Sequence, residues 1–478
     1  MRVFLCCPPT GKFIRDERCQ IDITSRVAEN IREPIQPLYL AGLLKTYGHD
    51  VLLKDYSVRQ VPAAAVAHEV KQFAPACVYL ETTQGTIESD GAFIALLAKE
   101  CPAVFFIIKT PFVDEKILTE RLIPPLEGND ARLYCIVEEF ERSIKHILDY
   151  ESGNKNMPCN ASGYIIEQGA VQPLPGYTGE PFSMDEYPVP PRYFLNKHDY
   201  VRPDTGEPIA YIYSAKGCPY DCVFCSAPAY LGTYVNQRSP EKLIAEMHDC
   251  IEQYGITNFF FRSDTFTFDK EHVKEFCRRI IEKKWRLSWG TNSRVDKIDE
   301  EMLILMKQAG CDIIGFGIES GSDVILEKIK KGISSADIEK THRLVTRTGI
   351  RTFLHSIVGF PWDTEETVRE TKQLIRRLNP HFIEVNVPYP LYGTELYAFA
   401  EEHGLFVSRS FADYSHVKPI LKTLYMDTER INSLRRELLW SFYVRPSYII
   451  KTLLRAGKPR VIYNYLRWGV SLIFKLLA

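Results

Sequence analysis

Short apolar runs alternate with amphipathic helical stretches over the first 150 residues. The apolar runs are rich in β-branched and aromatic residues, and helical patterns lie between them, for example over 37–47 and 87–99. Continuous apolar strands that alternate with helices predict a parallel, doubly wound α/β sheet, whose ligands lie at the carboxyl ends of the strands. The expected strands cover residues 2–7, 51–56, 76–82, 104–110 and 133–138.

The pattern breaks over residues 151–205, which are rich in Gly, Pro, Asn and Tyr. Such a composition is typical of loops and linkers, and it predicts a linker that wraps between domains. A short hairpin over 163–171 is expected within it. The first domain is therefore expected to cover residues 1–150.

From residue 208 the strand–helix rhythm resumes with longer helices. Six strand–helix units predict a partial (β/α)6 barrel over 206–400, whose active groups gather at the carboxyl ends of the strands. The expected strands are 209–215, 258–264, 287–295, 313–320, 352–360 and 382–390, and the expected helices are 240–254, 270–284, 299–308, 322–330, 335–348 and 365–378.

Residues 401–478 are expected to form a helical region that ends in a basic, aromatic tail. No acidic residue follows Glu437, and Arg467 and Lys475 interrupt the last apolar stretch, so a membrane-spanning helix is not expected. A basic amphipathic surface with aromatic residues suits peripheral contact with anionic lipid. The alternative is a helical cap that packs on the barrel and keeps its basic side in water.

Composition places the 478-residue chain among ordinary globular proteins, with 25% charged and 45% hydrophobic residues. The net charge of −2 gives no general attraction to nucleic acid, which is not expected as a partner. The 13 cysteines are odd in number and mostly scattered, which fits a reducing cytoplasm. The first residues show no signal-peptide pattern, because their apolar run is short and leads directly into Pro8 and Pro9.

The strongest chemical signal is the stretch GCPYDCVFCSAP, residues 217–228, which follows the first barrel strand. It sets Cys218, Cys222 and Cys225 in C-x3-C-x2-C spacing. Three such thiolates can hold three irons of a [4Fe–4S] cubane and leave the fourth iron open to a small molecule. A structural zinc site would need a fourth ligand that no neighbouring pair supplies, and a disulfide framework does not suit the odd count.

This spacing, with the aromatic Phe224 before the last cysteine, resembles the radical S-adenosylmethionine (SAM) superfamily. The stretches SRVD, GFGIESGS and KKGIS, within residues 208–400, resemble that family as well. The resemblance implies that SAM chelates the open iron and is cleaved reductively to a 5′-deoxyadenosyl radical, which abstracts hydrogen from a substrate carbon. It also implies a small-molecule or lipid substrate and a reductant such as flavodoxin or ferredoxin.

The resemblance further places SAM against residues at consecutive strand ends. Asp264 or Ser263 could accept hydrogen bonds from the methionine ammonium, and the fork of Arg294 suits a carboxylate. Taken singly, each is more often a cap or an ion-pair residue; their succession behind one cysteine loop favours a site. The residues expected around SAM are Phe224, Ser263, Asp264, Asn292, Arg294, Glu319, Ser320, Gly359 and Pro361.

Three further aromatic side chains at strand ends have two interpretations. His355 is either a packed core histidine or a catalytic one. Tyr389 and Tyr392 are either amphipathic packing residues or contacts and hydrogen donors for the substrate.

The first domain resembles the cobalamin-binding domain that precedes many radical SAM modules. Two departures stand out: no D-x-H-x-x-G motif offers a lower ligand to cobalt, and Ile108-Lys109-Thr110-Pro111 replaces the Gly-Gly expected after the fourth strand. Glycines there would let the backbone approach a nucleotide tail closely. The alternative is a Rossmann-like domain that keeps the fold, binds no cobalamin and caps the active site.

The sequence therefore predicts a radical SAM enzyme that acts on an unactivated carbon, with cobalamin-dependent C-methylation as the first hypothesis. Cobalamin-independent carbon–carbon coupling, cyclisation or rearrangement, on a lipid or isoprenoid substrate among others, is the alternative. A methylthiotransferase would need a second cluster, for which Cys6, Cys7, Cys19 and Cys77 are the N-terminal candidates. A non-catalytic iron–sulfur protein would not need the strand-end series.

Overall fold

The computed structural model describes residues 1–15, 20–25, 31–59, 61–126, 131–153, 160–231 and 233–477. The chain forms two compact units. The first consists mainly of Met1–Ile23 and Ile31–Asp199, and the second of Tyr200–Pro228 and Thr233–Ala478. Cys19, one of the candidates for a second cluster, lies outside the described residues.

The first unit is built on a seven-stranded sheet in the order β4-β1-β5-β6-β7-β8-β9. Its first five strands are parallel, and the predicted hairpin, β8 and β9, continues the sheet antiparallel to β7. The order of the five parallel strands reverses between β1 and β5, where such sheets bind their ligands. The strands are β1 (Arg2–Cys7), β4 (Asp50–Asp55), β5 (Cys77–Glu81), β6 (Phe105–Lys109), β7 (Leu133–Glu138), β8 (Ser162–Glu167) and β9 (Ala170–Pro173).

Helices between these strands cover the sheet, because their apolar sides and the strands share one core, in which Leu5, Leu44, Tyr79, Ile107 and Ile147 are all buried. The predicted doubly wound α/β fold is thereby confirmed. The helices are α1 (Ile35–Thr46), α2 (Ala63–Phe73), α3 (Ile87–Glu100), α4 (Glu115–Ile117) and α5 (Phe140–Glu151), and a small antiparallel pair, β2 (Phe13–Arg15) and β3 (Gln20–Asp22), follows β1.

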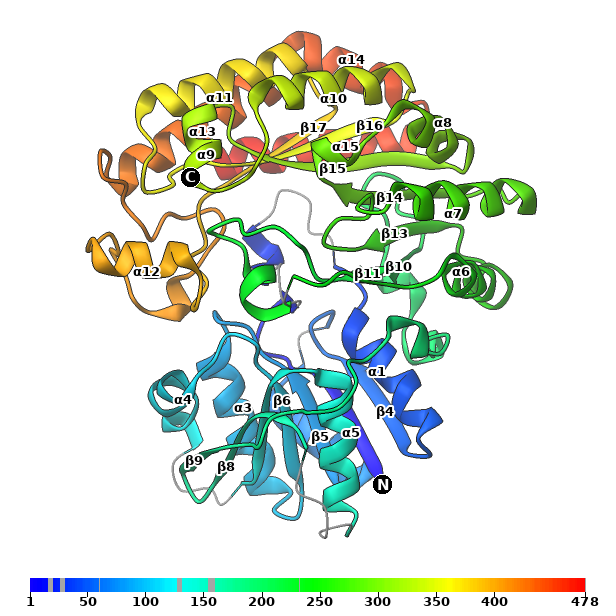
Figure 1. Cartoon of the computed structure of the whole chain (residues 1–478), viewed down its shortest axis with the longest axis vertical. Coiled ribbons are helices and arrows are strands. Elements are labelled where there is room, and N and C mark those ends of the chain that lie inside the picture. Colours follow the sequence, from blue (N-terminus) through cyan, green and yellow to red (C-terminus); the bar gives the residue numbers. More distant parts are fainter. Residues whose placement is uncertain are drawn as a thin grey trace. The chain divides into compact units, whose positions relative to one another are not determined.

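The second unit holds a six-stranded, entirely parallel sheet in sequential order (Figure 1). Alternate residues of β15 show how the sheet is oriented: Ile314, Phe316 and Ile318 are buried among helix residues, whereas Gly315 and Gly317 lie on the other face. The partial barrel is thereby confirmed. Its strands are β10 (Ile209–Tyr213), β13 (Asn258–Arg262), β14 (Ser288–Ser293), β15 (Cys311–Glu319), β16 (Arg351–Ile357) and β17 (Phe382–Asn386).

The helices of this sheet begin at the capping residues that the sequence supplies. Asp269, Asp299, Ser334 and Thr364 each accept a hydrogen bond from a backbone N–H in the first turn, which satisfies a group that the helix itself leaves unpaired. The helices are α6 (Pro240–Tyr254), α7 (Lys270–Lys283), α8 (Glu300–Gln308), α9 (Asp323–Lys328), α10 (Ser335–Arg347), α11 (Glu365–Leu378) and α12 (Glu395–Glu402).

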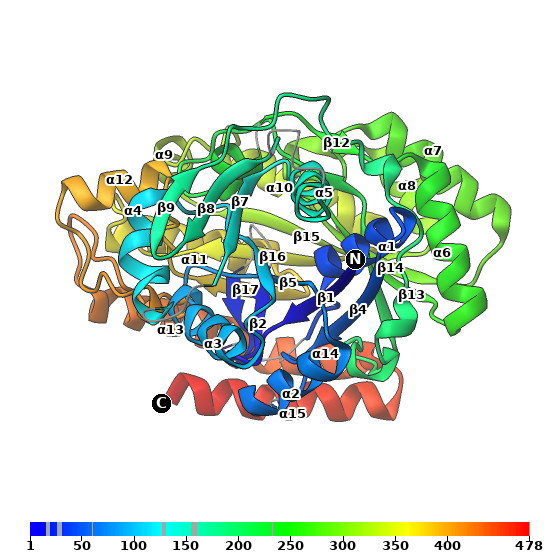
Figure 2. The same cartoon turned by 90° about the horizontal axis from the view of Figure 1, so that it is seen from below.

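The C-terminal region is helical, as the sequence predicts. Figure 2 shows α14 and α15 beside each other, and α15 is long and straight. Among the described residues, no helix is long and apolar enough to cross a membrane. The three helices are α13 (Thr428–Tyr443), α14 (Pro446–Ala456) and α15 (Pro459–Leu477).

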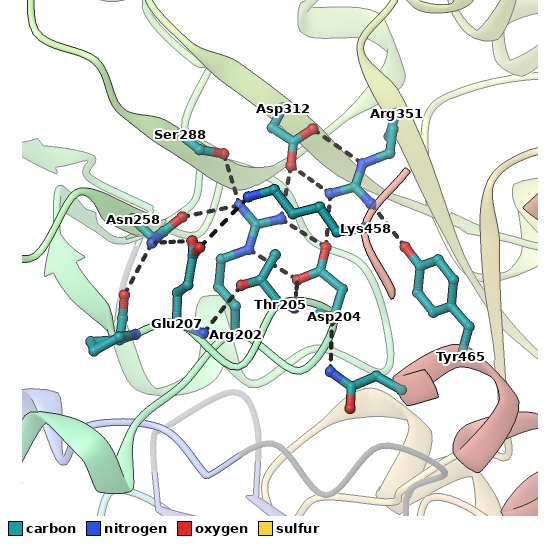
Figure 3. Close-up of polar contacts among 12 residues, drawn as sticks. Arg202, Asp204, Thr205, Glu207, Asn258, Ser288, Asp312, Arg351, Lys458 and Tyr465 are labelled. Carbon is teal, nitrogen blue, oxygen red and sulfur yellow. Dashed lines mark hydrogen bonds and ion pairs between the residues drawn. The ribbon is translucent and has the colours of Figure 1, made fainter. Parts of the chain in front are cut away.

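A polar network joins the amino ends of the barrel strands to a preceding loop (Figure 3). Arg202 donates to Asp204 at 2.8 Å and to Asp312 at 2.9 Å, and Arg351 donates to the same two carboxylates at 3.2 and 2.5 Å. Burial raises the pKa of Asp204 and of Asp312, but their bonds to the two guanidinium groups outweigh it and hold both values below the ordinary range. The network fixes the edge opposite the predicted site.

Candidate functional site

The cysteine loop begins at Gly217, directly after β11 (Ala215–Lys216). Gly217 has a φ of +90°, and a β-carbon there would lie 1.9 Å from the carbonyl oxygen of Tyr234, so only glycine fits. Its N–H donates to Asp264 Oδ2 at 2.7 Å. Asp264, predicted as a ligand of the methionine ammonium, therefore also anchors the loop to the end of β13.

The middle of the loop is held by backbone bonds to the end of α9 and the start of α12. The N–H of Val223 donates to the carbonyl of Ile329 at 3.2 Å, and the N–H of Leu396 donates to the carbonyl of Val223 at 2.9 Å. The Phe224 ring lies 5.4 Å from that of Phe360, which follows β16. The loop is thus fixed against the carboxyl edge of the sheet before any cofactor binds.

The three cysteines lie on this fixed segment with little exposure. Cys218 and Cys222 are buried, and Cys225 is half-buried, with its sulfur accepting a hydrogen bond from the N–H of Ala227 at 3.5 Å. Hydrogen bonds to cysteine sulfur are among the features that tune iron–sulfur clusters. Burial raises the pKa of the Cys222 thiol, and the charges of Lys331 and Arg294 oppose that rise.

In the part of the chain that the structure describes, no three His, Cys, Asp or Glu side chains converge as ligands of a single metal ion. A cubane does not require such convergence, because each cysteine binds a different iron. Spacing, burial and the N–H···S bond fit a [4Fe–4S] cluster held by Cys218, Cys222 and Cys225.

Lys331 brings several of the predicted residues together. Its Nζ donates to Glu319 Oε1 at 2.7 Å, with side chains only 8% and 10% exposed, and it lies 6.0 Å from the Phe224 ring. Glu319 has a φ of +57° at a register shift between β15 and β16. This left-handed conformation costs a non-glycine residue about 1 kcal/mol or more, and such strain clusters at functional sites. Glu319 therefore stands out as a candidate ligand.

Arg294 is held rigidly beside the loop. It donates to Asp296 at 2.9 Å and to the carbonyl of Lys331 at 2.7 Å, and its guanidinium lies 3.6 Å from the centre of the Tyr220 ring. These contacts engage two of its nitrogens. The guanidinium is therefore preorganised, but it has fewer N–H groups left to donate to the carboxylate of SAM.

On the inner face of the sheet, polar side chains lie over the glycines of β15. A β-carbon at Gly315 would lie 2.3 Å from Asn292 Oδ1 and 3.0 Å from His355 Nε2, so both side chains lie over this glycine. His355 Nδ1 pairs with Glu384 Oε2 at 3.0 Å. Of the two interpretations of His355, this geometry favours the one in which an oriented imidazole faces the inside of the barrel.

The turn after β16 is organised by a buried carboxylate. Gly359 has a φ of +101°, and the N–H groups of Gly359 and Phe360 both donate to Asp363 Oδ2 at 2.9 Å. Burial raises the pKa of Asp363 to about 6, although hydrogen bonds from Thr367 and the two N–H groups oppose it. Asp363 thus shapes the turn that carries Gly359, one of the residues expected around SAM.

Other predicted residues are engaged elsewhere. The Ser320 hydroxyl lies 3.1 Å from that of Thr371 on α11, and Ser263 Oγ accepts from the N–H of Thr265. The Pro361 carbonyl accepts from the N–H of Leu424 at 2.8 Å. Their roles toward SAM stay predictions, as do those of the candidate ligands above.

Two tyrosines noted in the sequence make aromatic contacts. The Tyr389 ring stacks on that of His416 at 4.6 Å, and the Tyr392 ring lies 5.1 Å from that of Tyr397. Both contacts agree with the packing interpretation and leave a substrate role for Tyr389 and Tyr392 as a prediction.

In the first unit, polar side chains fill the strand ends where the order reverses. Arg15 pairs with Asp90 at 2.6 Å, with both side chains buried, and donates to the carbonyl of Glu81 at 2.8 Å. The hydroxyls of Thr82 and Thr86 donate to the same Asp90 carboxylate. This network ties the segment after β1 to the end of β5.

The neighbouring strand end, β6, bears directly on cobalamin. Lys109 is buried, lies 3.7 Å from Glu81 and 4.3 Å from the centre of the Phe140 ring, and Thr110 Oγ1 is buried without a hydrogen-bond partner. Side chains therefore occupy the edge where glycines would admit a nucleotide tail. At this edge the chain offers a buried Lys side chain and an unpaired Thr hydroxyl in place of a glycine backbone.

The described candidates for a second cluster are strand residues. Cys6 and Cys7 lie on β1 and Cys77 on β5, and burial raises the pKa of all three well above the usual range. Cys77 pairs with Val3, three residues before Cys6, which puts Cys77 and Cys6 roughly 10 Å apart along the strands. Their positions suit core packing.

The fold and the loop define a class: an α/β protein whose parallel partial barrel carries a cysteine triad at its carboxyl edge. Residues 212–375 match the family described as the Radical SAM superfamily. This part of the chain is therefore a radical SAM domain, and the domain before it has the Rossmann-like fold of the cobalamin-binding type.

Relatives share this organisation along the whole chain. An uncharacterised methyltransferase of Pyrococcus horikoshii is 29% identical over 457 residues, 95% of each chain. An anaerobic magnesium-protoporphyrin IX monomethyl ester cyclase of Rubrivivax gelatinosus is 25% identical over 402 residues, 82% of this chain and 70% of its own. The structure of the radical SAM methyltransferase TsrM of Kitasatospora setae, with cobalamin and a [4Fe–4S] cluster bound, shares the fold with a TM-score of 0.66 at 17% identity and 99% coverage of both chains.

Two site residues were missed by the sequence interpretation. Lys331 is part of the KKGIS stretch that resembles the family, so its position was marked although its bond to Glu319 was not. Asp363 had no such signal, because an Asp after Gly-Phe-Pro-Trp is ordinary turn chemistry until its two backbone partners are seen.

Proposed function

We propose that this enzyme methylates an unactivated carbon by radical chemistry, with cobalamin as the methyl carrier. The observation that supports this most strongly is the likeness over 95% of the chain to a relative named as a methyltransferase. The fold shared along the whole chain with a cobalamin-bound radical SAM methyltransferase agrees with it.

The [4Fe–4S] cluster, when bound, supplies the electron that cleaves SAM to methionine and a 5′-deoxyadenosyl radical. The chain's own residues would orient SAM for this step. The bond from Gly217 to Asp264 holds the loop in place, and the buried pair of Lys331 and Glu319 puts a carboxylate and an ammonium beside Cys222. Asp363 would hold the backbone of Gly359 against the adenine.

The inner face of the barrel is the proposed place for the substrate. Asn292 and His355 lie over Gly315 on this face, and with Glu384 they supply polar contacts. A small molecule or a lipid with one hydrogen-bonding group near the reacting carbon would suit this surface. Flavodoxin or ferredoxin is the proposed reductant.

A second candidate function is cobalamin-independent cyclisation, carbon–carbon coupling or rearrangement. Lys109, buried at the end of β6 under the Phe140 ring of α5, favours it, because its side chain fills an edge where glycines would admit a nucleotide tail. A relative over 82% of this chain is named as a cyclase, which agrees with cyclisation as the outcome of the reaction.

One purification separates the two candidates. Protein from cells supplied with cobalamin is isolated under anaerobic conditions, and its visible spectrum is recorded beside that of protein from unsupplied cells. The methylation proposal expects corrinoid absorption in stoichiometric amount, which only supplied cells give. No bound corrinoid, together with full cleavage of SAM, would reject cobalamin-dependent methylation and favour the second candidate.

A further inference from the structure

Large apolar side chains are exposed in an unusual concentration on the C-terminal helices. The described residues include 17 exposed large hydrophobic side chains, and nine of them lie between Trp440 and Phe474. Isolated exposed apolar residues are ordinary, but a contiguous group marks a surface for a partner or a membrane. The nine are Trp440, Ile449, Ile450, Leu454, Tyr463, Leu466, Val470, Ile473 and Phe474.

On α15 the exposed residues form one helical face. Tyr463, Leu466, Val470, Ile473 and Phe474 follow at intervals of three and four residues, which puts them on one side of the helix. Their exposed fractions reach 64% at Tyr463 and 69% at Phe474. The helix therefore presents an apolar stripe outward along its length.

The opposite side of α15 is held by the barrel, so the exposure of this stripe is built into the fold. The Asn464 amide donates to the carbonyl of Asp204 at 2.8 Å, and the Tyr465 hydroxyl accepts from Arg351 at 3.3 Å (Figure 3). Val461 and Leu472 are buried on the same side. Rotating the helix to hide its stripe would break this network.

The charges around the stripe are of one sign. Residues 438–478 contain seven Lys or Arg and no Asp or Glu. Arg467 is exposed on α15, and Lys451 and Arg455 on α14 line a cavity of about 210 Å³ whose lining includes no acidic residue. His381 in that cavity has its pKa lowered to about 4 by burial and by the nearby arginines, so the positive charge comes from the Lys and Arg side chains.

We propose that the exposed faces of α14 and α15 dock on the surface of an anionic phospholipid bilayer. The apolar stripe would enter the boundary between headgroups and acyl chains, and Lys451, Arg455 and Arg467 would contact the lipid phosphates. Neither helix has an apolar stretch long enough to cross a bilayer, so both would lie in the plane of the membrane–water interface. This inference does not depend on the chemistry of the radical site.

The first test is co-sedimentation of the full chain with vesicles of phosphatidylcholine, with and without phosphatidylglycerol. The triple variant Leu454→Gln, Leu466→Gln, Phe474→Gln changes only exposed side chains. We expect it to bind anionic vesicles at least ~10-fold more weakly than the unaltered chain, because each residue loses its buried apolar area. The control, Ile304→Gln, Val324→Gln, Val407→Gln, alters three other exposed apolar residues, which lie elsewhere, and is expected to bind normally.

The second test removes charge. Arg455→Gln with Arg467→Gln should weaken binding to anionic vesicles roughly 30-fold, since each basic residue near the surface is worth about a factor of five. The control is Lys242→Gln with Arg286→Gln, which removes one exposed cation from α6 and one from the loop before β14. We expect it to leave binding unchanged.

Two outcomes would overturn the inference. One is that the full chain does not sediment with anionic vesicles. The other is that both triple variants, or both charge variants, bind equally. Sedimentation velocity tests whether a second copy of the chain covers the stripe instead. If the chain is a dimer, and only the α14–α15 triple variant is a monomer, the stripe is a dimer interface. That result would also reject the lipid surface.

Discussion

At the scale of single residues, the site depends on charges that are buried in pairs. Lys331 and Glu319 neutralise each other beside Cys222, and both side chains are too buried for water to take the place of the partner charge. A buried pair adds little net stability, but removing one member leaves an uncompensated charge.

Lys331→Met is therefore expected to destabilise the chain by about 3–5 kcal/mol, because Glu319 keeps its burial and loses its counter-charge. The variant should also bind SAM more weakly. Urea unfolding and equilibrium binding of SAM measure the two effects. The adjacent Lys330→Met is the control, since Lys330 pairs with Glu395 at the surface, where both side chains are more than half exposed. Equal effects of the two substitutions would contradict the role given to Lys331.

Asp363 gives a pH-dependent prediction. Its folded pKa of about 6 lies above the unfolded value near 4, so the folded chain binds the proton more tightly between these pH values. The unfolding free energy of the intact chain, relative to Asp363→Asn, should therefore fall by about 2 kcal/mol as the pH rises from about 4 to about 6. Urea titrations across this range test it, and parallel profiles of the two proteins would contradict the assignment.

At the scale of elements, the cysteine loop depends on one backbone conformation. Gly217→Ala would place a methyl group against the Tyr234 carbonyl in a left-handed conformation. The loop should then leave its bond to Asp264, and iron retained after reconstitution should fall well below about four per chain. Iron analysis measures this. Gly255→Ala is a control of the same backbone type, because nothing lies within 4 Å of its new β-carbon. Full iron in Gly217→Ala would contradict the loop's dependence on this turn.

The sequence predicted the elements well where pattern alone decides them. Strands such as 209–213 and helices such as 240–254 follow from apolar periodicity and from Pro or Gly at their ends. The hairpin was expected at 163–171 within a linker, but its pairing with β7 was not, because most residues of β8 and β9 are only partly buried and carry little apolar pattern.

Candidate site residues could be predicted from the sequence where they lie at the end of a strand. Asp264, Arg294 and Glu319 could be named because parallel strands bring their carboxyl ends to one edge. Their partners could not: the bond from Gly217 to Asp264 spans 47 residues, and that of His355 with Glu384 spans 29. Such pairings depend on strand order and register, which no local pattern encodes.

At the scale of the whole molecule, the aspartates of the polar network at the amino edge predict the acid response. Their folded pKa values lie below the unfolded values, so their contribution to stability is present above pH about 4 and is lost as pH falls through the lower folded values. Asp204→Asn should be less stable than the intact chain at neutral pH and should lose less on acidification. Asp50→Asn, at an exposed ion pair, should follow the intact chain. Urea midpoints at each pH measure this, and an unchanged acid profile in Asp204→Asn would contradict it.

The central claim is that the loop at residues 217–228 makes this chain a generator of the 5′-deoxyadenosyl radical. The most direct measurement is 5′-deoxyadenosine formation from SAM by anaerobically reconstituted protein with a chemical reductant, for the intact chain and for Cys222→Ala. Cys250→Ala is the control, since this buried cysteine lies on α6 in the core. We predict about four irons per chain and 5′-deoxyadenosine formation for the intact chain and the control, and neither for Cys222→Ala. Persistent 5′-deoxyadenosine formation by Cys222→Ala would contradict the claim.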